Sequence, residues 1–127
     1  GAAIGTAKNV QRSTDILSTI MMQNGVVMHE NGAITFDQLP PGSSRQVIPG
    51  IEALQFYTDF ASPSKKAYTW NETMPNSIDA FSNGTVAYYF GYAYDLPTIR
   101  ARAPKLNFGL SKFPQIDPAN EINFANY

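Results

Sequence analysis

Residues 85–90 are Thr-Val-Ala-Tyr-Tyr-Phe, a run of β-branched and aromatic side chains around one alanine. Such residues favour β-strands, and the lack of polar–apolar alternation is typical of a strand buried on both faces of a sheet. Gly91 ends the run. We therefore expect a central strand over residues 85–90 with helices around it, which places the chain in the α/β class.

Four helices are expected. Their apolar side chains recur three or four residues apart, and proline, glycine or a capping residue marks their ends. Pro49 opens the second helix, Asp95 is placed to cap the fourth, and Gly25 suits the end of the first because glycine adopts a left-handed conformation without strain. The predicted helices span residues 14–24, 51–60, 76–83 and 95–102. One face of the second helix is expected to carry Ala53, Phe56, Tyr57 and Phe60, with Leu54 beside them.

Shorter strands are expected as well. Residues 2–6 and 108–110 are apolar strand candidates, and Asn31-Gly32 predicts a β-hairpin with a type I′ turn, which needs positive φ at both central residues. Together these elements predict a small mixed sheet flanked by helices.

Composition excludes several classes of site. Nine Lys and Arg against ten Asp and Glu give a net charge of −1, with no basic stripe to offset phosphates, so nucleic acid is not an expected partner. The chain has no cysteine and one histidine, His29, which rules out disulfides, thiolate metal sites and multi-histidine metal sites. His29 beside the Asn-Gly turn is expected to be an exposed hairpin residue. We expect no cofactor, no metal and no catalytic residue, and no apolar run reaches the roughly 18 residues that span a membrane.

Three regions carry candidate ligand-binding residues. The loop after the expected strand holds Tyr92 and Tyr94, whose rings would cover the apolar face of a sugar while nearby polar groups bond its hydroxyls. A second loop holds Trp70 and Asn71. The start of the first helix offers polar side chains and free backbone N–H groups; the residues concerned are Asn9, Arg12, Thr14 and Asp15.

Each region has a structural alternative. Trp70 would serve equally as a core anchor, since tryptophan is highly buried on average. The two tyrosines would equally cap the core, and the polar residues before the first helix would simply cap it.

Short motifs spread over nearly the whole chain resemble a known family. They are Ala3-Ile4-Gly5-Thr6, Asp15-Ile16-Leu17 with Gln23-Asn24-Gly25, Ala53-Leu54-Gln55-Phe56-Tyr57, Tyr68-Thr69-Trp70-Asn71, Asp79-Ala80-Phe81 with Gly84 and Ala87, Gly91-Tyr92, Pro104-Lys105-Leu106-Asn107-Phe108-Gly109, and Phe113-Pro114-Gln115. In their order and spacing the chain resembles the C-terminal lobe of extracellular solute-binding proteins of family 1, the maltose-binding-protein-like receptors of bacterial ABC sugar importers.

The resemblance implies a partial C-terminal lobe of a two-lobe, type II periplasmic-binding-protein-like fold. Residues 1–127 would form a single incomplete domain, without the N-terminal lobe and the final helices. The implied ligand is a carbohydrate, expected to be an oligosaccharide, and the implied partner is a membrane permease. The implied location is the periplasm or the outer face of a bacterial membrane, held there peripherally by a lipid anchor; an incomplete lobe is also expected to self-associate. The resemblance places residues 12–15, 70–71 and 92–94 at the ligand cleft.

Two function hypotheses follow. The first is non-enzymatic capture of a sugar, with closure of the lobes on the ligand. The alternative is a glycan-active enzyme or adhesion module that uses the same aromatic residues. A hydrolase needs two carboxylates about 5–10 Å apart, and the acids near the aromatic loops are Asp15, Glu72 and Asp95.

Overall fold

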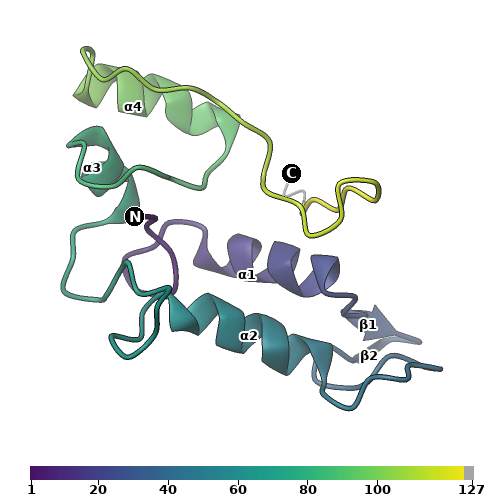
Figure 1. Ribbon diagram of the computed structural model, residues 1–127. Helices are drawn as coiled ribbons and strands as arrows, with labels where there is room; N and C mark the ends of the chain where they lie inside the picture. Colours follow the sequence, from purple (N-terminus) through teal and green to yellow (C-terminus); the bar gives the residue numbers. More distant parts are fainter. Residues whose placement is uncertain (125–127) are drawn as a thin grey trace. The chain divides into compact units, whose positions relative to one another are not determined.

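The computed structural model describes residues 1–124 and shows a mostly helical chain with one tiny sheet. The helices are α1 (Ser13–Gln23), α2 (Pro49–Asp59), α3 (Ser77–Ser82) and α4 (Leu96–Arg102), with a 3₁₀ turn, η1 (Ala93–Asp95), leading into α4. The strands β1 (His29–Glu30) and β2 (Ala33–Ile34) form an antiparallel pair (Figure 1). Contacts divide the chain into two compact units. The first contains residues 1–13 and 58–113, and the second contains residues 14–57 with the tail from Pro114.

All four predicted helices are present, within two residues of their expected bounds. Helix α1 buries Ile16, Ile20 and Met21. It ends at Gly25, whose φ of +83° lets Val26 N–H return to the Met21 carbonyl at 3.0 Å. The first helix is thus confirmed together with its stop signal.

The hairpin is also confirmed. His29 pairs with Ile34 and Glu30 with Ala33. Asn31 and Gly32 have φ values of +50° and +80°, the signs that a type I′ turn requires. His29 is exposed, as expected of a hairpin residue.

Helix α2 buries a narrower face than predicted. Ala53 and Tyr57, one turn apart, are buried. The expectation for Phe56 and Leu54 is wrong, since their side chains are 54% and 46% exposed. The buried stripe runs through Pro49, Ala53 and Tyr57, which lie at i, i+4 and i+8, and Phe56 and Leu54 fall on either side of it.

The predicted sheet is the main error. Residues 85–90 form no strand, and Tyr88 makes only an isolated parallel bridge with Ala2. Tyr88 is 66% exposed, so the expectation of burial on both faces is wrong as well. Residues 2–6 and 108–110 are likewise not strands among the described residues. A ladder needs a neighbouring backbone along its length, and here only Gly1, Ala2 and Ala3 pair with residues 87–88. The α/β class is therefore corrected to a mostly helical fold.

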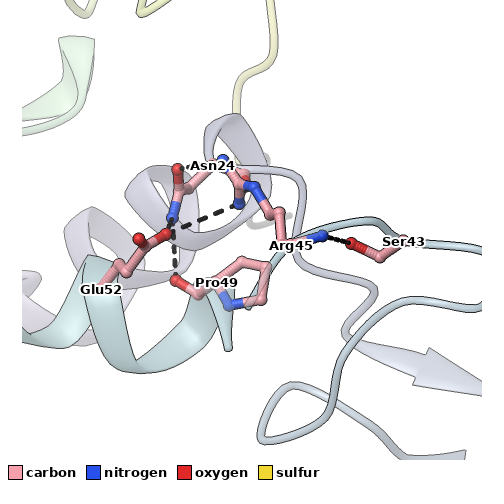
Figure 2. Close-up of polar contacts among 5 residues, drawn as sticks. All are labelled: Asn24, Ser43, Arg45, Pro49 and Glu52. Carbon is pink, nitrogen blue, oxygen red and sulfur yellow. Dashed lines mark hydrogen bonds and ion pairs between the residues drawn. The ribbon is translucent and has the colours of Figure 1, made fainter. Parts of the chain in front are cut away.

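A polar cluster in the second unit fixes the loop before α2 (Figure 2). The Asn24 side-chain amide donates to the Pro49 carbonyl at 2.9 Å and to Glu52 at 3.3 Å. Arg45 donates to the Asn24 backbone carbonyl at 2.6 Å, and its guanidinium lies 3.7 Å from the Glu52 carboxylate. The Ser43 hydroxyl accepts from the Arg45 backbone N–H at 3.2 Å. The end of α1 and the first turn of α2 are thereby joined through hydrogen bonds.

The first unit has its own core. Its buried apolar residues come from the N-terminal segment, from the loop before α3, and from α3 and α4. They are Ala3, Ile4, Val10, Trp70, Ile78, Ala80 and Ile99. This unit carries six of the eight predicted site residues.

Candidate functional site

Asn9 and Trp70 lie in the interior of the first unit, hydrogen-bonded to each other. Trp70 is 1% exposed, and its indole N–H donates to the Asn9 side-chain oxygen at 3.2 Å. The Asn9 amide nitrogen donates to the carbonyls of Asn71 and Met74 at 2.9 and 2.8 Å, and Thr6 donates to the Asn9 oxygen at 2.5 Å. The side-chain oxygen and the side-chain nitrogen of Asn9 are therefore both hydrogen-bonded within the fold. Neither face of the Trp70 indole is open to a ligand in this conformation, and this is the position expected of the core-anchor alternative.

Asn71 closes the loop that follows Trp70. Its amide nitrogen donates to the Tyr68 hydroxyl at 2.6 Å. Its side-chain oxygen accepts from the backbone N–H and the hydroxyl of Thr73, at 2.9 and 2.6 Å. This is the local pattern by which asparagine stabilises turns, so the Asn71 side chain is also engaged within the fold.

Tyr92, Tyr94 and Arg12 form an accessible cluster, which we call the tyrosine–arginine cluster. The two rings are stacked, with centroids 5.5 Å apart and planes inclined by 18°. The Arg12 guanidinium carbon lies 5.7 Å from the Tyr92 centroid and 5.4 Å from the Tyr94 centroid, within cation–π range. Arg12 also donates a hydrogen bond to the Tyr94 hydroxyl. Tyr94 is 59% exposed, so more than half of this side chain is accessible to solvent, with a cation beside its ring.

Arg12 reaches this position through an unusual backbone. Its φ is +63°, a conformation that L-residues other than glycine, asparagine and aspartate seldom adopt. The next residue, Ser13, starts α1. Non-glycine residues held in the left-handed region occur more often than expected at ligand sites. Here the side chain of such a residue, Arg12, bonds to Tyr94, which lies 82 residues further along the chain.

Asp95 and Tyr89 organise the loop that carries the two tyrosines. Asp95 is 5% exposed; its carboxylate accepts from the Tyr89 hydroxyl at 2.8 Å and from the Tyr92 backbone N–H at 3.3 Å. Asp95 occupies the N-cap position of α4, as predicted, but its carboxylate makes no cap hydrogen bond to that helix and accepts from residues 89 and 92 instead.

The Tyr89 phenol responds to this setting. Burial raises the pKa of Tyr89 above its ordinary value, and the hydrogen bond to Asp95 and the charge of that carboxylate raise the pKa further. The positive charge of Arg12 acts in the opposite direction. Tyr89 is therefore held in its protonated, donating form.

Gly91 permits this arrangement. A Cβ at this position would lie 2.5 Å from the Asp95 carboxylate and 2.5 Å from a ring carbon of Tyr89. Only a residue without a side chain leaves room for the hydrogen bond between them.

A cavity of about 240 Å³ adjoins the tyrosine–arginine cluster. Tyr92, Asp95 and Tyr89 form its polar side, and Phe81, Ile99 and Phe108 are among its apolar lining residues. The Phe108 ring packs edge-on against Phe81, with centroids 5.6 Å apart. Its mixture of aromatic and polar groups is typical of small-molecule sites, and among its lining residues the only carboxylate is Asp95.

The structure therefore brings together Arg12, Tyr92 and Tyr94 from the predicted set. Asn9, Trp70 and Asn71 lie in the same unit but bond to the fold, and Thr14 and Asp15 belong to the second unit. Tyr89 and Asp95 are not among the ligand-binding residues predicted from the sequence, although Asp95 ends the predicted site loop and is one of the acids of the enzyme alternative. The sequence signal for both was Gly91, a glycine between aromatic residues where close approach of side chains needs a missing Cβ.

In residues 1–124 no helix is long and apolar enough to cross a membrane. Nor does this part of the chain bring three His, Cys, Asp or Glu side chains together in a group that could hold a metal ion.

Comparison with known proteins gives no assignment. The chain matches no protein-family description, no curated protein and no solved structure at a significant level.

Proposed function

We propose that this chain binds a carbohydrate, and that the tyrosine–arginine cluster is the surface that contacts it. The observation that carries the proposal is the stacked pair Tyr92 and Tyr94, with Tyr94 59% exposed and Arg12 donating to its hydroxyl. An aromatic ring beside a fork of N–H donors complements a sugar, which has an apolar face of C–H groups and a rim of hydroxyls. The rings cover its C–H groups, and the guanidinium bonds its oxygen atoms.

The order of the loop supports binding rather than simple surface exposure. A ligand surface must hold its side chains in place before the ligand arrives, since ordering them on binding costs affinity. Here the buried Asp95 carboxylate bonds to Tyr89 and to the backbone of Tyr92, and the 3₁₀ turn η1 places Tyr94 two residues further on. The tyrosines are thus presented on a braced turn.

At the level of family, we propose that the chain is part of the C-terminal lobe of a solute-binding protein of family 1, with a type II periplasmic-binding-protein-like fold. This finer assignment rests on the motifs quoted above. The same motifs underlie the proposed delivery of an oligosaccharide to an ABC permease and the proposed location in the periplasm or on a lipid anchor outside the membrane. A glycan-cleaving enzyme has less support, because a hydrolase needs two carboxylates across the sugar and the lining of the cavity supplies Asp95.

The test is titration calorimetry of the full chain with a panel of neutral and acidic oligosaccharides, repeated with Tyr94→Ala. Loss of one stacking ring is expected to weaken binding by roughly 1–3 kcal/mol, or about 5- to 150-fold. Tyr88→Ala is the matched control, because Tyr88 is equally exposed and its contact with Ala2 is made by the backbone. Failure of every oligosaccharide to bind, or an equal effect of the two substitutions, would refute the proposal.

A further inference from the structure

The arginines of this chain differ in what neutralises them. Arg45 pairs with Glu52 at 3.7 Å, and Arg102 pairs with Asp79. Within residues 1–13 and 58–113, neither Arg12 nor Arg100 has a carboxylate within ion-pair distance. Arg100 is exposed and lies over the Phe108 ring, whereas Arg12 is half-buried and contacts the Tyr94 hydroxyl and the rings of Tyr92 and Tyr94. Arg12 is therefore a cation held at the proposed ligand surface without a counter-ion from the described residues of its own unit.

The surroundings of Arg12 also strip water from it. The side chain is half-buried against the two tyrosines, and its Nε–H is buried without an acceptor. A guanidinium that has lost part of its hydration gains more from an anion than a fully hydrated one does, because the local dielectric is lower. The planar fork of its remaining N–H groups matches the two oxygens of a carboxylate.

Asp95 does not fill this role. Its carboxylate is engaged with the Tyr89 hydroxyl and the Tyr92 backbone N–H, on the inner side of the loop. The positive charge of Arg12 lowers the pKa of Tyr89, but by less than Asp95 raises it. The two opposite charges thus remain separate, one braced inside the loop and one beside the exposed tyrosine.

We propose that the carbohydrate recognised by this surface is acidic, with a carboxylate on a sugar ring, and that Arg12 is the residue that selects it. The ring of such a uronate would stack on Tyr94 while its carboxylate takes the place of the missing counter-ion. This inference rests on the proposed function and narrows its ligand class from carbohydrates in general to uronate-containing oligosaccharides.

The experiment compares two ligands that differ only at the carboxylate. Calorimetry of the full chain is run with trigalacturonate and with the corresponding neutral galactose trisaccharide. The acidic ligand is expected to bind at least about tenfold more tightly, the scale of a hydrogen-bonded charge pair. That preference is expected to shrink when the salt concentration is raised from 0.05 to 0.5 M, since part of it is screened.

Two substitutions localise the effect. Arg12→Gln should abolish the preference, because it should weaken binding of trigalacturonate at least about tenfold more than it weakens binding of the neutral trisaccharide, and Arg12→Lys should keep part of the preference. Arg100→Gln is the matched control, because it removes the same charge from the same unit. The Arg100 guanidinium carbon lies 5.1 Å from the centroid of the Phe108 ring. The emission of the buried Trp70 verifies that each variant is folded.

The outcomes separate the two proposals. Equal binding of both trisaccharides by the unsubstituted chain overturns the acidic-ligand inference and leaves carbohydrate binding intact. A preference that survives Arg12→Gln, or that Arg100→Gln removes as fully, also overturns the inference, because charge in general would then explain it. Binding of neither trisaccharide, nor of any other sugar in the panel, overturns both.

Discussion

Replacing Tyr89 with phenylalanine tests whether the hydrogen bond to Asp95 braces the first unit. The substitution removes one hydroxyl and keeps the ring, which packs against Phe81 at 5.8 Å between centroids. Asp95 then loses its 2.8 Å donor and keeps the Tyr92 N–H at 3.3 Å. A hydrogen bond to a charged group contributes about 1.5–3 kcal/mol to stability. Tyr89 is only half-buried, so water replaces part of this, and the expected loss is about 1–2 kcal/mol.

Urea denaturation followed by tryptophan fluorescence measures this loss. Trp70 is the single tryptophan of the sequence, and it is buried in the same unit as Tyr89 and Asp95, so its emission reports the unfolding of that unit. Tyr88→Phe is the control, since it deletes the same atom from a neighbouring, exposed tyrosine. If the free energies of unfolding of the two variants agree within about 0.5 kcal/mol, the scatter expected of surface changes, the hydrogen bond does not brace the unit.

Three further outcomes are expected from the contacts of Tyr89, Gly91 and Gly50. The pKa of Tyr89 is raised in the folded state, so the phenol of the unfolded chain loses its proton at a lower pH. The unsubstituted chain should therefore be more stable than Tyr89→Phe up to pH 10, and this difference should shrink above pH 10. Urea midpoints of the two chains between about pH 8 and 11.5 measure it. Gly91→Ala places a methyl group 2.5 Å from a Tyr89 ring carbon and should cost about 1–3 kcal/mol, whereas Gly109→Ala, with open space around it, should cost little in the same urea titration. Gly50→Ala places a methyl group 2.1 Å from the Phe36 carbonyl oxygen, so circular dichroism should show a melting temperature lowered by several degrees, and an unchanged midpoint would contradict the close approach.

Helices and the hairpin turn were predictable because their determinants are local. The bonds of α1 join residues four apart, and the helix ends where the Gly25 N–H bonds to the Met22 carbonyl and the Val26 N–H bonds to the Met21 carbonyl. The Asn31-Gly32 turn likewise depends on two φ angles that those residues adopt readily. Because local residues set where such elements begin and end, the sequence pattern located the helices within two residues.

The predicted sheet failed for the opposite reason. A strand is stabilised by another segment of backbone, and the composition of residues 85–90 shows only that they suit an extended conformation. Whether a neighbour pairs with them along their length is a property of the whole fold. Among the described residues, the only strand-like pairing that residues 85–90 make is the single bridge between Tyr88 and Ala2.

The candidate site divides along the same line. Sequence alone identified Tyr92, Tyr94 and Arg12 as residue types suited to a sugar, and it placed the tyrosines in a loop before the fourth helix and Arg12 just before the first. Only the tertiary structure decided that Trp70 is buried and hydrogen-bonded to Asn9. It also decided that Arg12 bonds to Tyr94, which lies 82 residues further along the chain. Burial and side-chain partnership depend on which distant segments meet, and that is set by the sum of non-local contacts rather than by any short run of the chain.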